Sequence, residues 1–253
     1  MPRRFLILSA ALLFAVMPVP VQASGGEHPP QMNWRFDGPL GTYDRAALQR
    51  GFQVYRQVCS ACHSMKRVAY RNLSALGYSE EEIKALAAED VVMDGPNDEG
   101  EMFERPALPS DRFVSPFPND EAAKAANNGA LPPDLSLIVK ARANGANHVF
   151  GVLTGYEKPP ADEELGEGQY WNKYFPGHKI SMPPPLMRGA VDYEDGTAGS
   201  VEQYAKDVSH FLTWASAPEM EDRERTGIKA ILFLLLFAGV MYAVKKKIWA
   251  ELH

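Results

Sequence analysis

Two long apolar runs lie near the two ends of the 253-residue chain, and their flanking residues differ. The first run, Phe5 to Met17, follows two arginines and precedes a small-residue stretch that ends at Ala23. This arrangement predicts a cleaved export signal over residues 1–23, with an uncleaved N-terminal anchor as the alternative. The second run, Ile228 to Val244, is followed at once by three lysines. It predicts a membrane-spanning helix over residues 226–245, with a buried core helix as the alternative.

Several segments between these runs carry apolar residues at helical spacing. One begins after Thr42, a candidate N-cap, and runs to a pair of cysteines with its apolar residues on one face. The clearest amphipathic segment follows a capping box of Ser200 and Gln203 and ends before Pro218. Shorter helices are expected over residues 79–89, 120–127, 132–142 and 148–153.

Two stretches lack this periodicity and are rich in Gly and Pro. Residues 94–104 are predicted to form a surface loop, and residues 158–199 a long loop. The second loop needs support beyond its own hydrogen bonds, which a bound cofactor could provide. No segment shows the alternation of a strand, and no internal repeat is present. We therefore predict a mainly α fold with long loops and one C-terminal transmembrane helix.

The distribution of charge predicts on which side of the membrane each segment of the chain lies. Positive residues favour the cytoplasmic side, so the lysines place a short tail, residues 246–253, in the cytoplasm and residues 24–225 in the periplasm. Residues 24–228 contain 20 Lys and Arg against 31 Asp and Glu, a net charge of −11. This acidity argues against nucleic acid as a partner and favours a basic soluble protein.

The chain contains only two cysteines, Cys59 and Cys62, and His63 follows them directly. C-x-x-C-H is the pattern of c-type haem attachment, in which each thiol adds to one vinyl group of the porphyrin. The adjacent imidazole of His63 can then bind the iron. A redox-active dithiol and half of a zinc site are the alternatives, although a thioredoxin-like motif needs a preceding strand and zinc needs further ligands.

The sixth position of the iron decides between electron transfer and the binding of a gas or peroxide. Met182 is the best-placed candidate because the prolines at 183–185 restrict its backbone, and core filler is the alternative role. Met187 and His178 are the fallback ligands. The other downstream candidates are Met65, Met93, Met102, Met220, His148 and His210. Arg142 is a candidate partner for a haem propionate.

The ordered motifs of the chain resemble those of cytochrome c1, the haem subunit of ubiquinol:cytochrome c oxidoreductase, the cytochrome bc1 complex. The resemblance covers nearly the whole mature chain. It is carried by RGFQVY before CSACHSM, DGPN, GEMF, ANNGALPPDLS, LTGY, YFPG, Met182 with Pro184, DGT and AKDV. It implies a cytochrome c-like haem domain with one haem c, with Met182 as sixth ligand and Asn127, Pro132 and Arg142 in the haem environment. Some bacterial relatives have a further cysteine pair, which this chain lacks.

The resemblance also implies a role in a respiratory or photosynthetic chain. The protein would sit beside cytochrome b, accept electrons from the Rieske iron-sulfur subunit and pass them to a soluble cytochrome c, with no catalysis of its own. Acidic clusters at 98–104 and 162–167 are expected to contribute to acceptor docking. A free-standing membrane-anchored monohaem cytochrome c feeding a terminal oxidase or reductase is the alternative. A haem enzyme or gas sensor would require that Met182 not bind iron.

Overall fold

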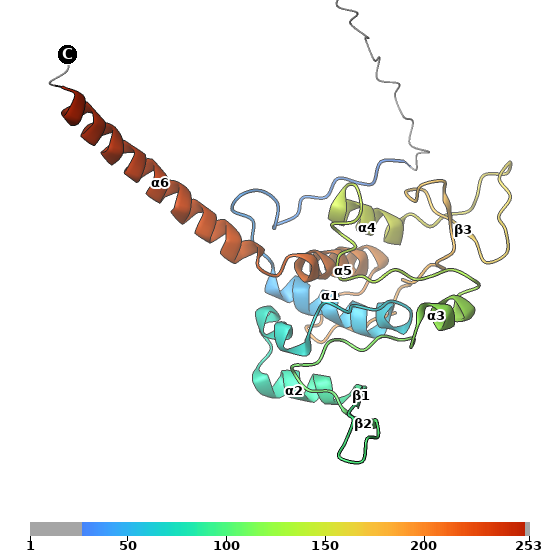
Figure 1. The fold of residues 1–253 in the computed structure, drawn as a ribbon. Coiled ribbons are helices and arrows are strands. Elements are labelled where there is room, and N and C mark those ends of the chain that lie inside the picture. The colour runs from blue at the N-terminus through green and yellow to red at the C-terminus, as the bar shows by residue number, and fades with distance from the viewer. Residues whose placement is uncertain (1–26, 251–253) are drawn as a thin grey trace, which may run out of the picture.

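The computed structural model describes residues 27–250, so the predicted export signal lies outside the described residues. The described part is mainly helical, as predicted (Figure 1). Its α-helices are α1 (Arg45–Gln57), α2 (Glu80–Ala88), α3 (Asp120–Ala126), α4 (Gly145–Thr154), α5 (Val201–Ser216) and α6 (Met220–Trp249). The 3₁₀ helices η1 (Cys59–Ala61) and η2 (Tyr70–Leu76) lie between α1 and α2. Antiparallel pairs join β1 (Val91–Asp94) to β2 (Phe103–Pro106) and β3 (Tyr170–Trp171) to β4 (Lys179–Ile180).

Helix starts are set by side chains that accept hydrogen bonds from free backbone amides. The predicted cap Thr42 is wrong, because the carboxylate of Asp44 accepts from the amides of Ala46 and Ala47 and α1 begins at Arg45. The α2 box is confirmed, with Ser79 and Glu82 bonded reciprocally. At α5 only half of the box forms, because the side chain of Gln203 bonds to Asp207 instead.

Three predictions of irregular or helical structure need correction. The predicted long loop at 158–199 contains the short β3–β4 pair, in which Tyr170 pairs with Ile180. The ends of the predicted loop at 94–104 form the β1–β2 hairpin, in which Asp94 pairs with Phe103. Strands of this length are too short to show alternation. Residues 132–142 form turns rather than a helix. Their amides are used elsewhere: Leu135 N donates to Ser64 O, 2.9 Å away, and Ser136 N donates to the side chain of Asp134.

The core is centred on the crossing of α1 and α5 (Figure 1). Aromatic side chains from both helices are fully or almost fully buried there. Phe52 and Tyr55 of α1 pack against Phe211 of α5, with ring centroids 5.8 Å apart in each pair. The helices touch at Gly51, where an added Cβ would lie 2.1 Å from the carbonyl oxygen of Asp207. A side chain at this position would therefore separate the two helices.

We expect Gly51→Ala to lower the free energy of unfolding by about 1–3 kcal/mol, because the methyl group must displace backbone. Gly227→Ala is the matched control: it is also a helical glycine, and nothing lies within 4 Å of its added Cβ. Urea unfolding of the detergent-solubilised protein, followed by far-UV circular dichroism, measures both. Equal stability of the two variants would contradict the close contact.

His210 lies on α5 in a buried aromatic pocket. Its ring packs edge-on against Phe36 and Tyr43, and its Nε2 accepts the amide hydrogen of Asp44 at 3.1 Å. Burial is the main cause that lowers the pKa of His210 to about 4, against the opposing charges of Asp44 and Asp207. The folded protein therefore holds this imidazole neutral.

We expect stability to fall as the pH decreases from about 6.5 towards 4, because the unfolded chain then binds a proton on His210 that the folded chain excludes. The loss should approach about 3 kcal/mol over that interval. Urea unfolding of a His210→Gln variant, which keeps an acceptor for Asp44, should show a flatter pH dependence than the unmodified protein. The exposed His28 provides the control variant His28→Gln. Identical slopes for all three proteins would contradict the prediction.

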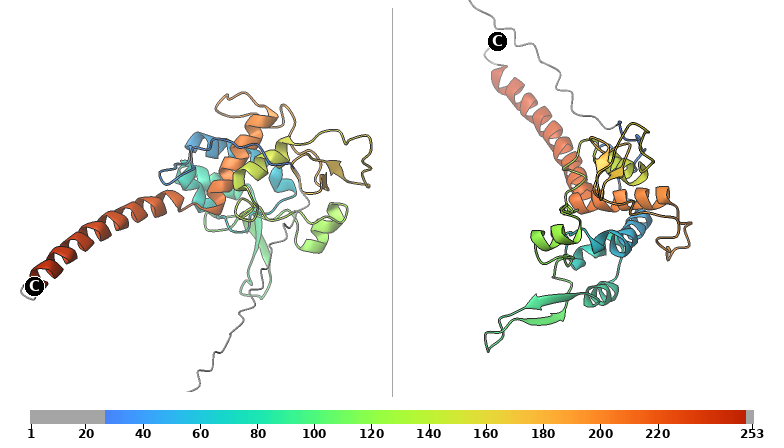
Figure 2. Two further views of the ribbon diagram at one scale, coloured as in Figure 1. Left: turned by 90° about the horizontal axis from the view of Figure 1, so that it is seen from above. Right: turned by 90° about the vertical axis from the view of Figure 1, so that its right-hand side faces the viewer.

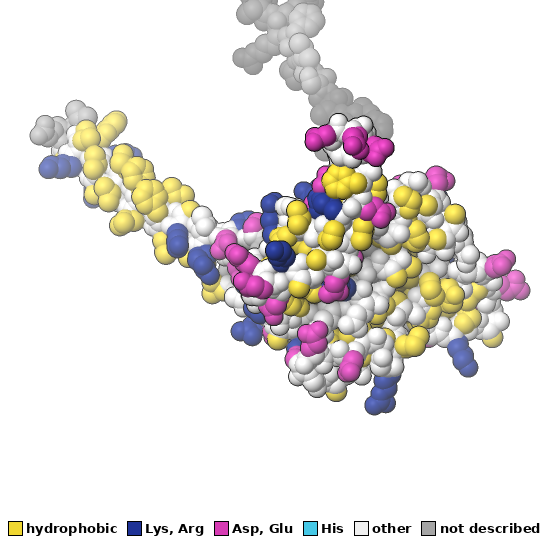
Figure 3. Space-filling model, turned by 90° about the horizontal axis from the view of Figure 1, so that it is seen from below, with side chains coloured by type: hydrophobic (Ala, Val, Ile, Leu, Met, Phe, Trp, Pro, Cys, Tyr) yellow, Lys and Arg dark blue, Asp and Glu magenta, His cyan; other side chains and the backbone are white. Residues whose placement is uncertain are grey.

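Helix α6 projects from the helical domain in every view (Figures 1 and 2). Among the described residues it is the one helix long and apolar enough to cross a membrane. Hydrophobic side chains cover its middle, and Lys and Arg side chains lie near both of its ends (Figure 3). The protein is membrane-anchored through this helix; the limits of the span at 226–245 stay a prediction.

The start of α6 is attached to the start of α1. Glu221 accepts hydrogen bonds from the amide of Tyr43 at 2.7 Å and from the guanidinium of Arg45 at 2.6 Å. The hydroxyl of Tyr43 donates to the carbonyl of Ala217, 3.0 Å away, and Met220 is buried. The helical domain and its anchor thus share a junction of hydrogen bonds rather than a free linker.

Candidate haem-binding site

The attachment motif lies on a tight turn directly after α1. The carbonyl of Cys59 accepts hydrogen bonds from the amides of Cys62 and His63, at 3.1 and 2.9 Å. Both thiols are free, with Cys59 half-buried and Cys62 exposed. The turn therefore presents two thiols and one imidazole from five consecutive residues, as the sequence predicts.

The electrostatics of Cys59 disfavour the dithiol alternative. Burial, with a smaller contribution from Cys62, raises the pKa of the Cys59 thiol to about 12. A redox-active dithiol needs a thiolate near neutral pH, which burial opposes at Cys59. The described residues also contain no group of three or more His, Cys, Asp and Glu side chains that could hold a metal ion. A zinc site thus has no donor set among them.

The imidazole of His63 is held by a backbone carbonyl. Its Nδ1 lies 2.8 Å from the oxygen of Pro133, and because a carbonyl only accepts, Nδ1 carries the proton. Burial lowers the pKa of His63, so the ring is neutral and Nε2 keeps its lone pair. Nε2 has no hydrogen-bond partner among the described residues. This is the state in which an imidazole binds a metal.

A second set of contacts fixes the segment that supplies this carbonyl. The carboxylate of Asp134 accepts from the hydroxyl of Ser64 and from the amides of Lys66 and Ser136, each at 2.9 Å. Although burial acts to raise the pKa of Asp134, these hydrogen bonds together lower it. This role of Asp134 leaves no local pattern in the sequence, because Ser64 and Asp134 are 70 residues apart.

The other residues predicted around the haem differ in their contacts and exposure. Pro132 lines a small cleft together with Cys62, which brings it to the attachment motif. Asn127 directly follows α3, and its side chain donates to the carbonyl of Ala123 in that helix, 2.7 Å away. Arg142 is exposed and donates to the carbonyl of Ala141 at 3.2 Å. The haem contacts of these three residues stay predictions.

Met182 is half-buried, and its carbonyl oxygen lies 3.0 Å from the hydroxyl of Tyr156. The fallback Met187 is 66% exposed. The fallback His178 donates from Nδ1 to the carbonyl of Asn172 and stacks on Trp171. Met182 as sixth ligand stays a prediction.

The remaining candidate ligands differ in position and burial. Met65, Met220 and His210 are buried in the hydrophobic core, whereas Met93 and Met102 are exposed on the β1–β2 hairpin and the loop that it encloses. His148 is half-buried on α4. The free thiols and the neutral, oriented imidazole of His63 fit a covalently attached haem.

Comparisons with known proteins identify the family of the chain. The sequence model of the Cytochrome C1 family matches residues 34–252. Cytochrome c1 of Rhodospirillum rubrum is 48% identical over 97% of this chain and 96% of its own length. The mitochondrial cytochrome c1-2 haem protein of Solanum tuberosum is 53% identical over 90% of this chain and 88% of its own. A Bradyrhizobium diazoefficiens protein named cytochrome b/c1 is 46% identical over 98% of this chain, which spans 39% of that relative. This chain belongs to the cytochrome c1 family.

Proposed function

We propose that this chain is the haem-bearing electron-transfer subunit of a cytochrome bc1 complex. It takes single electrons from the Rieske iron-sulfur protein and passes them to a soluble cytochrome c. The observation that carries the proposal is the attachment turn, where the hydrogen bond from His63 to Pro133 leaves Nε2 free beside two unpaired thiols. Family membership supports one covalently bound haem c.

The chain's own residues have separable tasks in this role. Cys59 and Cys62 would hold the haem covalently, and His63 and Met182 would bind its iron. The bound haem supplies reversible one-electron chemistry. Pro133 and Asp134 orient the imidazole and keep its proton on Nδ1. No proton transfer or nucleophile is needed, which agrees with a subunit that makes no bonds by itself.

The proposed partners and the orientation in the membrane are argued from a relative's name, from the anchor helix α6 and from the acidic surface residues. A relative from Candida albicans is named the catalytic subunit of the cytochrome b-c1 complex, which supports membership of such a complex. In our proposal α6 packs against cytochrome b, with the haem domain on the periplasmic side of the inner membrane and Lys245–Lys247 on the cytoplasmic side. The carboxylates of residues 98–104 and 162–167 are exposed and suited to dock a basic acceptor.

The optical spectrum of the reduced, membrane-extracted protein tests the proposed function. We expect a low-spin c-type spectrum that carbon monoxide does not change, because both axial positions are occupied. Ready binding of carbon monoxide by the unmodified protein would show an open position and favour an enzyme or sensor. Co-purification with a cytochrome b separates the complex subunit from the alternative, a free-standing anchored cytochrome c.

A further inference from the structure

We infer that Tyr156 is a positioning residue for the sixth ligand: its hydroxyl holds the backbone of Met182 against the C-terminal end of α4. This inference rests on the proposed function, in which Met182 binds the iron. Tyr156 lies within the LTGY motif, to which the sequence alone assigned no role.

Residues 172–182 form the segment that leads to Met182. The first half of this segment is attached to α4 by Asn172. This side chain is fully buried, and its Nδ2 donates to the carbonyl of Val152 at 2.7 Å. Its Oδ1 accepts from the amides of Tyr174 and Phe175 at 3.1 and 3.2 Å. One buried amide thus ties a turn of the long loop to the last turn of a helix.

The second half of this segment returns to the same end of α4. The amide of Asn172 donates to the carbonyl of His178 at 2.7 Å, and β4 pairs Ile180 with Tyr170. Two residues later the carbonyl of Met182 accepts the hydroxyl hydrogen of Tyr156 at 3.0 Å. Tyr156 itself forms an isolated bridge with Asn172. Both halves of the segment are therefore anchored at the end of α4.

The hydrogen bond from Tyr156 has no local substitute. It is the one hydrogen bond of Met182 among the described residues. The next three residues, Pro183 to Pro185, have no backbone N–H and cannot fasten the chain through donors of their own. Tyr156 is half-buried in a groove that Trp171 and Pro184 also line. Loss of the hydroxyl therefore frees the ligand's backbone while the ring still fills the groove.

Tyr156→Phe removes only the oxygen atom, and Tyr170→Phe is the matched control. Tyr170 lines the same groove, is 38% exposed, and its hydroxyl makes no hydrogen bond to the described residues. The measurement is the displacement of the sixth ligand from the ferric full-length holoprotein by added imidazole, followed by optical titration. We expect imidazole to bind about fivefold more tightly to Tyr156→Phe, because one hydrogen bond contributes about 1 kcal/mol. Tyr170→Phe should match the unmodified protein.

The possible outcomes separate this inference from the proposed function. Unchanged imidazole affinity in Tyr156→Phe would overturn the positioning role, and so would an equal change in both phenylalanine variants. A Met182→Leu variant provides the reference for a fully detached ligand. If that variant has the spectrum of the unmodified protein, the assignment of Met182 fails, and the proposed axial pair fails with it. If Met182→Leu alters the spectrum and Tyr156→Phe does not alter the affinity, only the positioning role fails.

Discussion

A Met182→Leu variant is expected to bind carbon monoxide in its reduced state and to lose the low-spin spectrum of the unmodified protein. Leucine is close to methionine in volume but has no lone pair to donate, so the swap opens the sixth position. A swap of this kind costs less than about 1.5 kcal/mol of stability, so the protein should fold and keep its haem. Because a methionine ligand raises the reduction potential, the potential should fall.

Met187→Leu is the control for this experiment. Met187 lies five residues after Met182 in the same loop, and its side chain is 66% exposed. We expect its spectrum and its response to carbon monoxide to match those of the unmodified protein. A carbon monoxide complex in Met187→Leu, with none in Met182→Leu, would transfer the role of sixth ligand to Met187.

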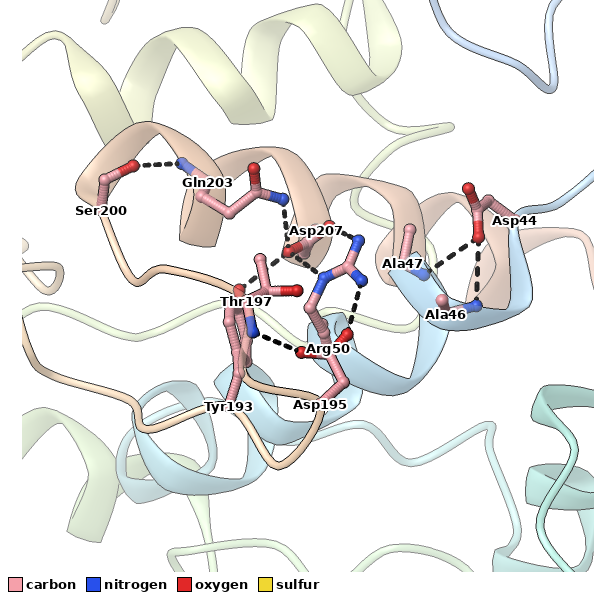
Figure 4. A network of polar contacts seen from close by, with 10 residues as sticks. All are labelled: Asp44, Ala46, Ala47, Arg50, Tyr193, Asp195, Thr197, Ser200, Gln203 and Asp207. Atoms are coloured by element: carbon pink, nitrogen blue, oxygen red, sulfur yellow. Dashed lines mark hydrogen bonds and ion pairs between the residues drawn. The ribbon is translucent and has the colours of Figure 1, made fainter.

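An Asp207→Ala variant is expected to lose about 3–5 kcal/mol of stability, because the substitution leaves a mostly buried guanidinium, 16% exposed, without its main partner. Asp207 is 1% exposed and accepts two hydrogen bonds from Arg50, at 2.8 and 3.2 Å (Figure 4). The hydroxyl of Tyr193 and the side chain of Gln203 donate to the same carboxylate at 2.9 and 2.8 Å. This network joins α1, α5 and the end of the loop at 158–199.

Asp195→Ala provides the comparison, because Asp195 also bonds to Arg50 at 2.8 Å but its side chain is 41% exposed. An exposed pair of this kind is worth about 0–1 kcal/mol. Urea unfolding of both variants measures the difference. Similar losses in the two variants would show that burial does not govern the strength of these pairs.

The double variant Arg50→Met/Asp207→Leu separates the value of the ion pair from the cost of an unpaired charge. Replacing both partners with apolar side chains should restore part of the stability that either single change removes. Strictly additive losses in this double-mutant cycle would contradict the pairing. A partial recovery would show that the two charges are coupled and that part of each single-variant loss is the cost of an unpaired charge.

Local patterns in the sequence correctly predicted the features that depend on neighbouring residues. The C-x-x-C-H turn, the α2 capping box and the apolar run before three lysines each lie within a few consecutive residues. Their geometry is set by covalent connectivity, by backbone amides one turn away and by the solvent around the helix. For this reason the attachment motif, most helices and the anchor could be predicted from the chain alone.

The same reasoning failed where a distant group competes for a local hydrogen bond. The apolar spacing of residues 132–142 suits a helix, yet the amide of Leu135 bonds to Ser64, about 70 residues earlier in the chain. Thr42 is a good capping residue, but Asp44 has the carboxylate that faces the free amides. Propensity is a weak prior when a tertiary contact offers a different partner.

The sequence by itself therefore determined the chemistry of this protein: two thiols and an imidazole in one motif, a methionine before three prolines, and a terminal span. Only the tertiary structure decided how those groups are held. It placed the carbonyl of Pro133 on His63, the hydroxyl of Tyr156 on Met182 and Asp207 on Arg50. Each of these bonds joins segments that come together only when α1, α4 and α5 pack around one core. Contacts of that kind depend on the whole fold, so no window of the sequence contains them.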